Sequence, residues 1–534
     1  MANPNHYQRD ASPMMVVGAG PTGLAAAMDL ARFGVPCRLI EKLPEPQTHS
    51  RAIAIQPRTL ELFEQRGLVE PILELGHKAH WANFYHGERR FLRLGFDRLP
   101  SRYHFVVFLD QTKTERIMAE KLGRLGVAVE RGVELVEFLD MGDRVELMLK
   151  HHDGRQERTS TPFLLGCDGA HSFVREHLHL SFEGKTFPGS YLLADVHIDW
   201  DMPDENEFYV FTSEEGLLPI FNLGNGISRL VADITEQQSG DKPSLEECQG
   251  ILDRRLRQPA RLSDLRWSAY FHINSRRVEK LKVGNVFVAG DAAHIHSPAA
   301  GQGMNTGIQE AINLAWKIAL VVRGEADERL LDTYDEERRP IEKKVITRTD
   351  TLFRMVGAQG GLLAFLRDNL VPLFANTEPV QRFITDFVSE LGIEYRSSSL
   401  ALADKLNGGA HAGDRAADAT VRVSSGPGRT SGAVRIFDLI DPAKFTLLLL
   451  DAVSAADTSP NNKAAAIISD ALPQRLEVWH VTSTNMPGLA EHYGKERPSF
   501  YLIRPDGYVM LRGTPADADK AADFCRQFFY CTPV

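Results

Sequence analysis

Short apolar runs and helical stretches alternate at the start of the chain. Met14–Gly18 is an apolar run that ends in glycine, Leu24–Phe33 carries apolar residues at helical spacing, and Cys37–Glu41 is a second apolar run closed by an acid. Short apolar runs bounded by glycine are typical of buried strands, and the middle segment has the period of a helix. The pattern predicts a strand–helix–strand unit of a parallel sheet, and therefore an α/β fold.

Two later apolar runs each lead to an aspartate in a turn. The first is Phe163–Cys167, which Asp168 follows, and the second opens the stretch Val286–Asn305, in which Asp291 follows the run. Ligands of parallel sheets bind at the carboxyl ends of the strands. We therefore expect both carboxylates at the ligand-binding edge of this sheet.

The pattern changes to period-two alternation between Lys185 and Lys282. Alternating residues that include many aromatic and β-branched side chains predict a mostly antiparallel sheet, inserted between two halves of the parallel-sheet domain. Such a sheet can form the wall of a substrate pocket. Its pocket candidates are Tyr209, Phe221, Tyr270 and His272.

The last part of the chain reads as a separate small α/β unit. The segment after the stretch Val286–Asn305 is helical to about Leu391, and Gly408–Gly432 is rich in Ala, Gly and Ser, as a domain boundary often is. The predicted organisation is a parallel-sheet domain at 1–184 and 283–400, an antiparallel-sheet domain at 185–282 and a C-terminal unit at 401–534.

Composition and charge restrict the class of partner. The 534 residues include 61 basic and 71 acidic side chains, a formal net charge of −10, without a run of like charges. This balance argues against nucleic acid and anionic membranes as partners and favours a small molecule. The N-terminus lacks the pattern of a signal peptide, and the five cysteines are widely spaced without a CxxC pair. We expect a cytoplasmic protein with reduced thiols.

The glycines of the first turn indicate a dinucleotide. Gly18-x-Gly20-x-x-Gly23 lies between the first strand and its helix, and Glu41 closes the next strand. Glycines let the backbone approach a pyrophosphate, and an acid at this distance can bind ribose hydroxyls. Arg51, in an otherwise apolar segment, suits a phosphate or a carboxylate.

The stretch Val286–Asn305 suits a flat, hydroxyl-bearing, partly anionic cofactor. It combines the carboxylate of Asp291 with the start of a glycine-rich helix, whose N-terminus favours negative charge. His294 and His296 have a spacing that suits a metal, but no third ligand lies nearby in the sequence. We therefore expect no metal site.

Together these motifs resemble the single-component FAD-dependent aromatic hydroxylases, the class A flavoprotein monooxygenases. The motifs are Gly18-Ala19-Gly20-Pro21-Thr22-Gly23, the Asp168-Gly169 turn, and Gly290-Asp291-Ala292-Ala293-His294 continuing to Pro298 and Gly301-Gln302-Gly303-Met304-Asn305. The tail, with Arg504-Pro505-Asp506-Gly507 and Arg512, resembles the thioredoxin-like C-terminal domain of the phenol hydroxylase and polyketide hydroxylase branch.

The resemblance implies a set of FAD-binding residues. The glycine turn with Pro21, Thr22, Glu41 and Lys42 would hold the ADP half, Arg51 and Gln111 the pyrophosphate region, Asp291 the ribityl chain, and Gly301, Gly303, Met304 and Asn305 the isoalloxazine. Asp168, with Arg175, would support both FAD and the passage of NADPH or NADH, for which the family has no second nucleotide fold.

The resemblance also implies the reaction. NAD(P)H and O2 would be used to hydroxylate a phenolic or polycyclic aromatic substrate through a flavin C4a-hydroperoxide, with Pro298 facing the substrate. Simple phenol hydroxylases carry an acid in the segment that matches Ala52–Ile55, and this chain has none. His272, Tyr209 or a substrate that arrives already activated remain as sources of an activated ring.

Several alternatives stay open. The same cofactor chemistry can give Baeyer–Villiger oxidation or epoxidation, and a flavin-binding protein without catalysis is a further reading. A flavin-dependent halogenase is disfavoured because no two tryptophans are two residues apart. In the tail, the absence of CxxC excludes dithiol chemistry and favours a packing or homodimer role.

Overall fold

The computed structural model describes residues 12–48, 52–187, 189–201, 206–234, 240–297, 301–356, 377–428, 432–451, 459–473, 475–482 and 487–530. Its central element is a six-stranded sheet in the order β20-β21-β12-β1-β2-β8. All neighbours pair parallel except β20 and β21. The strands are β1 (Met14–Val17), β2 (Cys37–Glu41), β8 (Val129–Arg131), β12 (Leu164–Gly166), β20 (Lys282–Val283) and β21 (Val286–Val288).

Helices pack beside this sheet and bury its middle strands. Helix α1 packs against both α7 and α4, and every residue of β1, β12 and β21 is buried. Strands buried on both faces carry continuous apolar runs, which is why the sequence pattern identified them. The helices of this domain are α1 (Pro21–Arg32), α2 (Pro57–Gln65), α3 (Val69–Leu75), α4 (Gln111–Arg124), α5 (Phe173–His177), α7 (Gly303–Val322), α8 (Thr333–Val356) and α11 (Glu378–Ser389), with short 3-10 turns η1 (Gly290–Ala292) and η2 (Glu328–Asp332).

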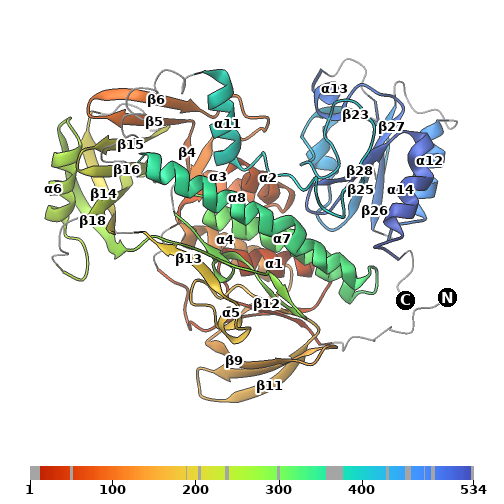
Figure 1. Cartoon of the computed structure of the whole chain (residues 1–534), viewed down its shortest axis with the longest axis horizontal. Helices are drawn as coiled ribbons and strands as arrows, with labels where there is room; N and C mark the ends of the chain where they lie inside the picture. Colours follow the sequence, from red (N-terminus) through yellow and green to blue (C-terminus); the bar gives the residue numbers. More distant parts are fainter. Residues whose placement is uncertain are drawn as a thin grey trace.

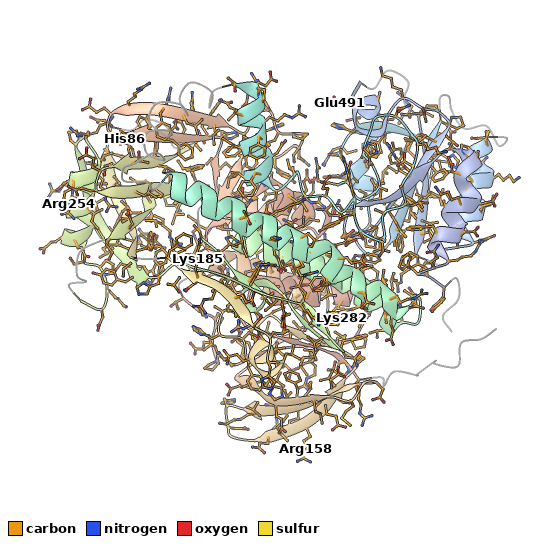
Figure 2. The ribbon with its side chains drawn as sticks, in the orientation of Figure 1. His86, Arg158, Lys185, Arg254, Lys282 and Glu491 are labelled. Carbon is orange, nitrogen blue, oxygen red and sulfur yellow. The ribbon has the colours of Figure 1, made fainter. Side chains whose placement is uncertain are left out.

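The second large element is a seven-stranded sheet in the order β18-β14-β17-β16-β15-β5-β6. Every pair is antiparallel except β15 with β5. One face is covered by α6 (Leu245–Arg255), and Figure 2 shows Arg254 of that helix at the outer edge of the molecule. The strands are β5 (Trp81–His86), β6 (Arg89–Gly95), β14 (Ser190–Trp200), β15 (Glu207–Ser213), β16 (Gly216–Asn222), β17 (Ile227–Ile234) and β18 (Ala260–Phe271).

The predicted boundary of the sheet domain at 185–282 is too narrow. Strands β5 and β6 come from the first half of the chain and complete the sheet at one edge. The parallel pairing of β5 with β15 joins segments that are far apart in sequence, so no local hairpin signal revealed it.

Three small sheets accompany the two large ones. They are β3-β7-β4, β13-β19-β22 and β9-β10-β11. Their strands are β3 (Ala54–Ile55), β4 (His77–Ala79), β7 (Val106–Phe108), β9 (Val133–Asp140), β10 (Val145–His151), β11 (Gln156–Thr161), β13 (Phe182–Thr186), β19 (Asn274–Val278) and β22 (His294–Ile295).

The C-terminal unit is a six-stranded sheet in the order β24-β23-β26-β25-β27-β28. Figure 1 shows it in blue beside the central domain, on the side away from α6. Its thioredoxin-like assignment stays a prediction. The elements are β23 (Thr420–Ser425), β24 (Gly432–Arg435), β25 (Phe445–Asp451), β26 (Leu476–Thr482), β27 (Ser499–Ile503), β28 (Val509–Gly513), α12 (Pro460–Ser469), α13 (Pro487–Tyr493), α14 (Ala518–Cys525), η4 (Ile436–Leu439) and η5 (Pro515–Asp517).

The C-terminal unit is less separate than the sequence suggested. Residues of β25 and α12 belong to the same buried apolar cluster as α7 and the central sheet. The ring of Trp316 on α7 meets that of Phe445 on β25 with centroids 5.8 Å apart. The two units therefore share one hydrophobic core. Among the described helices, none is long and apolar enough to cross a membrane.

Candidate functional site

The turn between β1 and α1 accepts only glycine at two of the three glycine positions of its motif. Gly18 has φ +100°, and a Cβ on it would lie 2.3 Å from the carbonyl oxygen of Cys167. A Cβ on Gly23 would lie 1.9 Å from the carbonyl oxygen of Gly18. Gly20 is the N-cap of α1, provides no side chain to cap it, and faces open space where a Cβ would point. An uncapped helix N-terminus beside open space suits an anion such as a pyrophosphate.

Glu41 reaches this turn from the end of β2. Its carboxylate accepts hydrogen bonds from the backbone N–H groups of Ala19 and Leu43, both at 3.0 Å. The acid is therefore held beside the start of α1, where the predicted ribose contact requires it. Lys42 is exposed, and Pro21 is buried at the first position of α1.

The second motif lies directly against the first. Cβ atoms on Gly290 and Gly307 would lie 2.5 and 2.4 Å from Oγ1 of Thr22, so the first turn of α1, η1 and the first turn of α7 meet at Thr22. Asp291 in η1 is exposed. Gln302 is the N-cap of α7 and makes no side-chain capping bond, which leaves a second helix N-terminus for a ligand.

The loop before α7 is close to β3. Gly301 has φ +62°, and a Cβ on it would lie 2.6 Å from Cβ of Ala54. A Cβ on Gly303 would meet no atom closer than His296 Nε2 at 3.7 Å. Met304 is half-buried. Among the described residues of this loop, Gly301 and Gly303 carry no side chain that would keep a flat ring away from the backbone.

The side chain of Asn305, which was predicted to line the isoalloxazine, forms hydrogen bonds within the protein. Its Oδ1 accepts the N–H of Gln56 at 3.0 Å, and its Nδ2 donates to the carbonyls of Ala54 and Gly301 at 2.9 and 2.8 Å. The side chain is fully buried. It therefore fastens β3 to the loop before α7, and only the backbone of this residue is available to line a cofactor.

Two glycine-lined turns, two uncapped helix N-termini and the carboxylates of Glu41 and Asp291 fit FAD. The N-termini match its anionic groups, and the carboxylates match its hydroxyls. Arg51 and Pro298 lie outside the described residues. Gln111 begins α4, donates its backbone N–H to the carbonyl of Ala52 at 3.2 Å, and bonds Glu115 through its side chain at 2.7 Å.

Asp168 stabilises the turn that leads into α5. Its carboxylate accepts bonds from the hydroxyl of Ser172 and the N–H of Val174, so it holds the start of α5. Burial raises the pKa of Asp168, against these hydrogen bonds. Arg175 is buried, donates to the carbonyls of Ala170 and Ala292 at 3.0 and 3.4 Å, and links this turn to η1.

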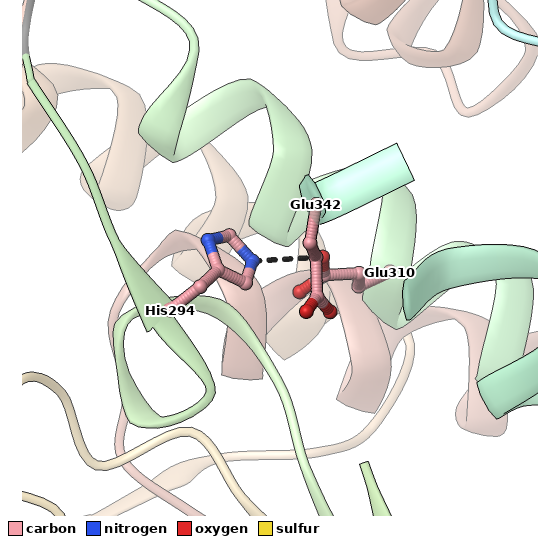
Figure 3. A group of neighbouring side chains, drawn as sticks. All are labelled: His294, Glu310 and Glu342. Atoms are coloured by element: carbon pink, nitrogen blue, oxygen red, sulfur yellow. Dashed lines mark hydrogen bonds and ion pairs between the residues drawn. The ribbon is translucent and has the colours of Figure 1, made fainter. Parts of the chain in front are cut away.

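A buried charge network lies behind η1, and sequence reasoning did not find it. Glu310 of α7 accepts the N–H of Gly290 at 2.9 Å and a bond from Nε2 of His294 at 2.8 Å. Arg338 of α8 lies 3.8 Å from Glu310. Figure 3 shows Glu342 beside His294 and Glu310. Within the described part of the chain, neither carboxylate oxygen of Glu342 has a hydrogen-bond partner.

Three side chains of metal-ligating type meet in this network, but they are not the predicted pair, because His296 is not among them. Ligand atoms of His294, Glu310 and Glu342 lie within 4.8 Å of one another. The guanidinium of Arg338 already faces Glu310, and a divalent cation would add charge of the same sign beside it. The geometry favours hydrogen-bonded positioning of Gly290 over metal binding.

Protonation of this network should make stability depend on pH. Burial lowers the pKa of His294, but the charge of Glu310 and its hydrogen bond outweigh burial and raise the pKa to about 9. Burial raises the pKa of Glu342 to about 8, with His294 and Arg338 acting against it and Glu310 and Asp335 adding to it. Both folded-state pKa values exceed the ordinary ones, so both groups favour folding at low pH. The contribution of Glu342 is lost as pH rises from about 4.5 to about 8, and that of His294 as pH rises from about 6.5 to about 9.

We therefore expect the unfolding temperature to fall between pH 7 and pH 9.5, and Glu342→Gln to reduce this fall. The amide stays neutral at every pH, so the variant should unfold about 2 to 4 °C above the parent at pH 9.5. Scanning calorimetry at both pH values checks this. A variant destabilised equally at both values would contradict the assignment.

The inner face of the seven-stranded sheet, opposite α6, points toward this site. Phe208 and Phe221 lie on it, with ring centroids 5.4 and 5.2 Å from Phe108 of β7. These rings belong to one apolar cluster with Ile53 and Ala54. Phe221 is thus placed where a substrate wall is expected, within reach of the loop before α7.

The other sheet candidates lie elsewhere. Tyr209 and Tyr270 belong to the apolar cluster on the α6 face, and the hydroxyl of Tyr270 donates to Glu247 of that helix at 2.6 Å. His272 is exposed, and its Nδ1 lies 3.2 Å from the carbonyl of Gly189. The structure does not bring these three side chains to the inner face. Tyr209 and Tyr270 face α6, because alternate residues of a strand face opposite sides, and His272 follows the end of β18.

A polar pair completes the inner face and was not predicted. Arg229 is 1% exposed, forms two hydrogen bonds with Asp195 at 2.7 and 2.8 Å, and lies 3.7 Å from Asp110 at the N-cap of α4. Its guanidinium also lies over the ring of Trp267, 5.3 Å from the centroid. The pair joins the sheet to the cofactor domain.

Known proteins match both the motifs and the fold. A family model described as an FAD binding domain matches residues 11–349. The chain is 35% identical to 6-methylpretetramide 4-monooxygenase of Streptomyces rimosus, over 95% of this chain and 91% of that protein. It is 32% identical to pentachlorophenol 4-monooxygenase of Sphingobium chlorophenolicum, over 93% of each.

A solved structure agrees over nearly the whole length. OxyS anhydrotetracycline hydroxylase from Streptomyces rimosus matches with a TM-score of 0.79 and 26% identity, over 98% of this chain and 100% of that one. The predicted FAD cofactor and the α/β fold are thereby confirmed. The chain belongs to the FAD binding domain family, among the FAD-dependent aromatic monooxygenases that its three motifs resemble.

Proposed function

We propose that this monooxygenase uses NADPH or NADH and O2 to hydroxylate a polycyclic phenol. The observation that carries the proposal is the aromatic inner face, with Phe108, Phe208 and Phe221, beside the loop that leads into α7. Aromatic rings stack against such a face in an apolar, water-poor environment. The named activities of the relatives on pretetramide and anhydrotetracycline compounds agree with a polycyclic substrate.

The chain's own residues would bind and orient the reactants. The start of α1 would take the pyrophosphate, Glu41 a ribose, Asp291 the ribityl chain, and the N-terminus of α7 the negative charge on the pyrimidine ring. Bound FAD would carry the reducing equivalents of NADPH or NADH and supply activated oxygen. The apolar segment Ile53–Ile55 and the inner face would exclude water from the reacting ring.

Ring activation is proposed to come from the substrate. The segment Ala52–Ile55 carries no acid, and Ile53 and Ala54 are buried among aromatic rings. His272 and Tyr209 lie away from the inner face. A phenol made acidic by conjugation with a neighbouring carbonyl needs no strong base, and polycyclic polyketide phenols have this chemistry.

Anaerobic reduction tests the proposal. Holoenzyme is mixed with NADPH or NADH, with and without polycyclic and simple phenols, and flavin absorbance is followed. We expect a cognate polycyclic phenol to accelerate reduction or to be oxygenated on admission of air. Reduction that no aromatic alters, with peroxide as the sole product, would contradict the proposal.

Phe221→Ala should weaken substrate binding without loss of FAD. Removal of a ring from the inner face forfeits apolar contact, and we expect KM to rise about tenfold. Tyr270→Phe is the matched control, because it lies in the same sheet on the α6 face. Steady-state kinetics should leave the control within about twofold of the parent. Equal effects of both variants would argue against the inner face as the substrate wall.

A further inference from the structure

The turn between β27 and β28 carries a buried arginine that is bound to the cofactor domain. Arg504 is 1% exposed, and its guanidinium donates two hydrogen bonds to Glu337 of α8, at 2.5 and 2.9 Å. A third bond runs from Nε to Asp506 at 3.0 Å. Two parallel bonds to one carboxylate fix both partners in direction as well as distance.

The same carboxylate also holds α7. Glu337 accepts Nζ of Lys317 at 2.8 Å and Nδ2 of Asn313 at 2.7 Å. Asn313 also donates to Asp506 at 3.2 Å. Two cations and two carboxylates thus balance in a dry interface, and removal of one leaves a buried charge without compensation.

One series of hydrogen bonds and ion pairs connects this cluster to η1. Arg338, next to Glu337 on α8, donates to the hydroxyl of Tyr395 at 2.8 Å and to the carbonyl of Thr306 at 3.2 Å. Thr306 lies in the first turn of α7. Arg338 also faces Glu310, which holds the N–H of Gly290.

A second series of contacts leads to the start of α2. The carbonyl of Asp506 accepts Nη2 of Arg58 at 3.1 Å, and Arg58 pairs with Glu61 at 3.1 Å. Gln56, the N-cap of α2, is the residue whose N–H is held by Asn305. The turn that carries Arg504 and Asp506 therefore contacts α2, α7 and α8. These helices are linked through hydrogen bonds and ion pairs to the Gly290 turn and to the loop before α7, where the flavin ring would bind.

We propose that the C-terminal unit functions in cofactor retention, with Arg504 and Asp506 as positioning residues that hold α7, α8 and α2 in the geometry that binds FAD. The unit does this without touching FAD. It fixes where the N-terminus of α7 and the Gly290 turn stand relative to α1. This role goes beyond the proposed aromatic hydroxylation and is independent of which substrate is oxidised.

Release of FAD from the full-length holoenzyme tests this role. Arg504→Lys keeps the charge but loses the pair of parallel hydrogen bonds to Glu337. FAD in the filtrate is measured after dilution and ultrafiltration. We expect it to show at least tenfold weaker binding than in the parent. The matched control is Arg512→Lys. Arg512 is also buried in β28, but it contacts Asp404, Leu406 and Gly408 within the C-terminal segment.

The readout separates positioning from stability. The unfolding temperatures of both apoproteins are measured in parallel. We expect the two variants to lose similar amounts of unfolding temperature, and Arg504→Lys to lose far more FAD affinity than Arg512→Lys. Equal FAD affinity of the two variants would overturn it. If Arg504→Lys does not fold, Asp506→Asn, which preserves shape, takes its place, and FAD binding within twofold of the parent would then overturn it. No aromatic substrate enters the experiment, so its outcome is distinct from that of the proposed function.

Discussion

Gly23→Ala is expected to yield a protein without FAD. A Cβ at this position would lie 1.9 Å from the carbonyl oxygen of Gly18, which is a backbone atom and cannot rotate away. Either the β1–α1 turn opens or α1 shifts, and both changes displace the helix N-terminus from the pyrophosphate site. We expect FAD affinity to fall on the order of 100-fold, equivalent to about 2.7 kcal/mol. Absorbance of the purified protein near the flavin bands, with FAD titration of the apoprotein, measures this.

Two other glycines serve as controls. Gly20→Ala meets no atom within 4 Å, so the apoprotein should keep its stability, and a loss confined to FAD affinity would show that the added methyl occupies cofactor space. Gly123→Ala also meets no atom within 4 Å, lies inside α4 on the surface, and should retain FAD fully. A Gly23→Ala protein that binds FAD as tightly as the Gly123→Ala protein would contradict the assigned turn.

Glu310→Ala is expected to cause the second large loss. The carboxylate accepts the N–H of Gly290 and pairs with His294, and Arg338 lies 3.8 Å away. Its removal leaves His294 and the N–H of Gly290 without their acceptor and takes the neighbouring negative charge away from the buried Arg338. Breaking a buried ion pair in this way typically costs about 3 to 5 kcal/mol. The Gly290 turn loses its anchor, so FAD affinity should fall with stability. Calorimetry and FAD titration measure both.

Glu310→Gln provides the graded comparison. It keeps an acceptor for Gly290 but loses the charge that balances Arg338, so it should lie between the parent and Glu310→Ala in both measurements. Burial acts to raise the pKa of Glu310, but His294 and Arg338 outweigh it and keep the pKa low, so the carboxylate is charged at neutral pH. A Glu310→Ala protein as stable as the parent would show that the network does not hold η1.

Local signals were sufficient to place the strands, turns and helices on which the predicted cofactor-binding residues lie. The glycine turn, Glu41 and the Gly290–Asn305 stretch are each defined by neighbours in sequence, so strand, turn and helix positions follow from period and glycine placement. The fold confirms the parallel sheet and the mostly antiparallel second sheet.

Contacts between segments that are far apart in the sequence could not be predicted from these local patterns. Period-two alternation shows that Phe221 and its neighbours in β16 face opposite sides, but it does not say which side faces the cofactor, and Tyr209 and Tyr270 lie on the α6 face. The pairing of β5 with β15 joins segments more than 100 residues apart. Glu310, Arg338 and Glu342 look like ordinary helical charges in sequence, and only packing of α7 against α8 shows that they are buried.

The C-terminal motif shows the same limit. Arg504 and Asp506 belong to a recognisable turn, yet their partners Glu337, Lys317 and Asn313 are contributed by α7 and α8, far away in sequence. A buried charge can be assigned a partner only once the fold brings the elements together. The prediction of a packing role for this unit is consistent with the shared core, and the homodimer stays a prediction.

Isotope incorporation tests the central claim most directly. Holoenzyme, NADPH or NADH and a panel of polycyclic phenols are incubated under ¹⁸O2 in ordinary water, and products are analysed by mass spectrometry. We expect an aromatic product that carries one atom of ¹⁸O from O2, with none introduced when the label is in water. Consumption of NAD(P)H and O2 with no ¹⁸O in any aromatic product, and hydrogen peroxide formed in equal amount, would contradict it.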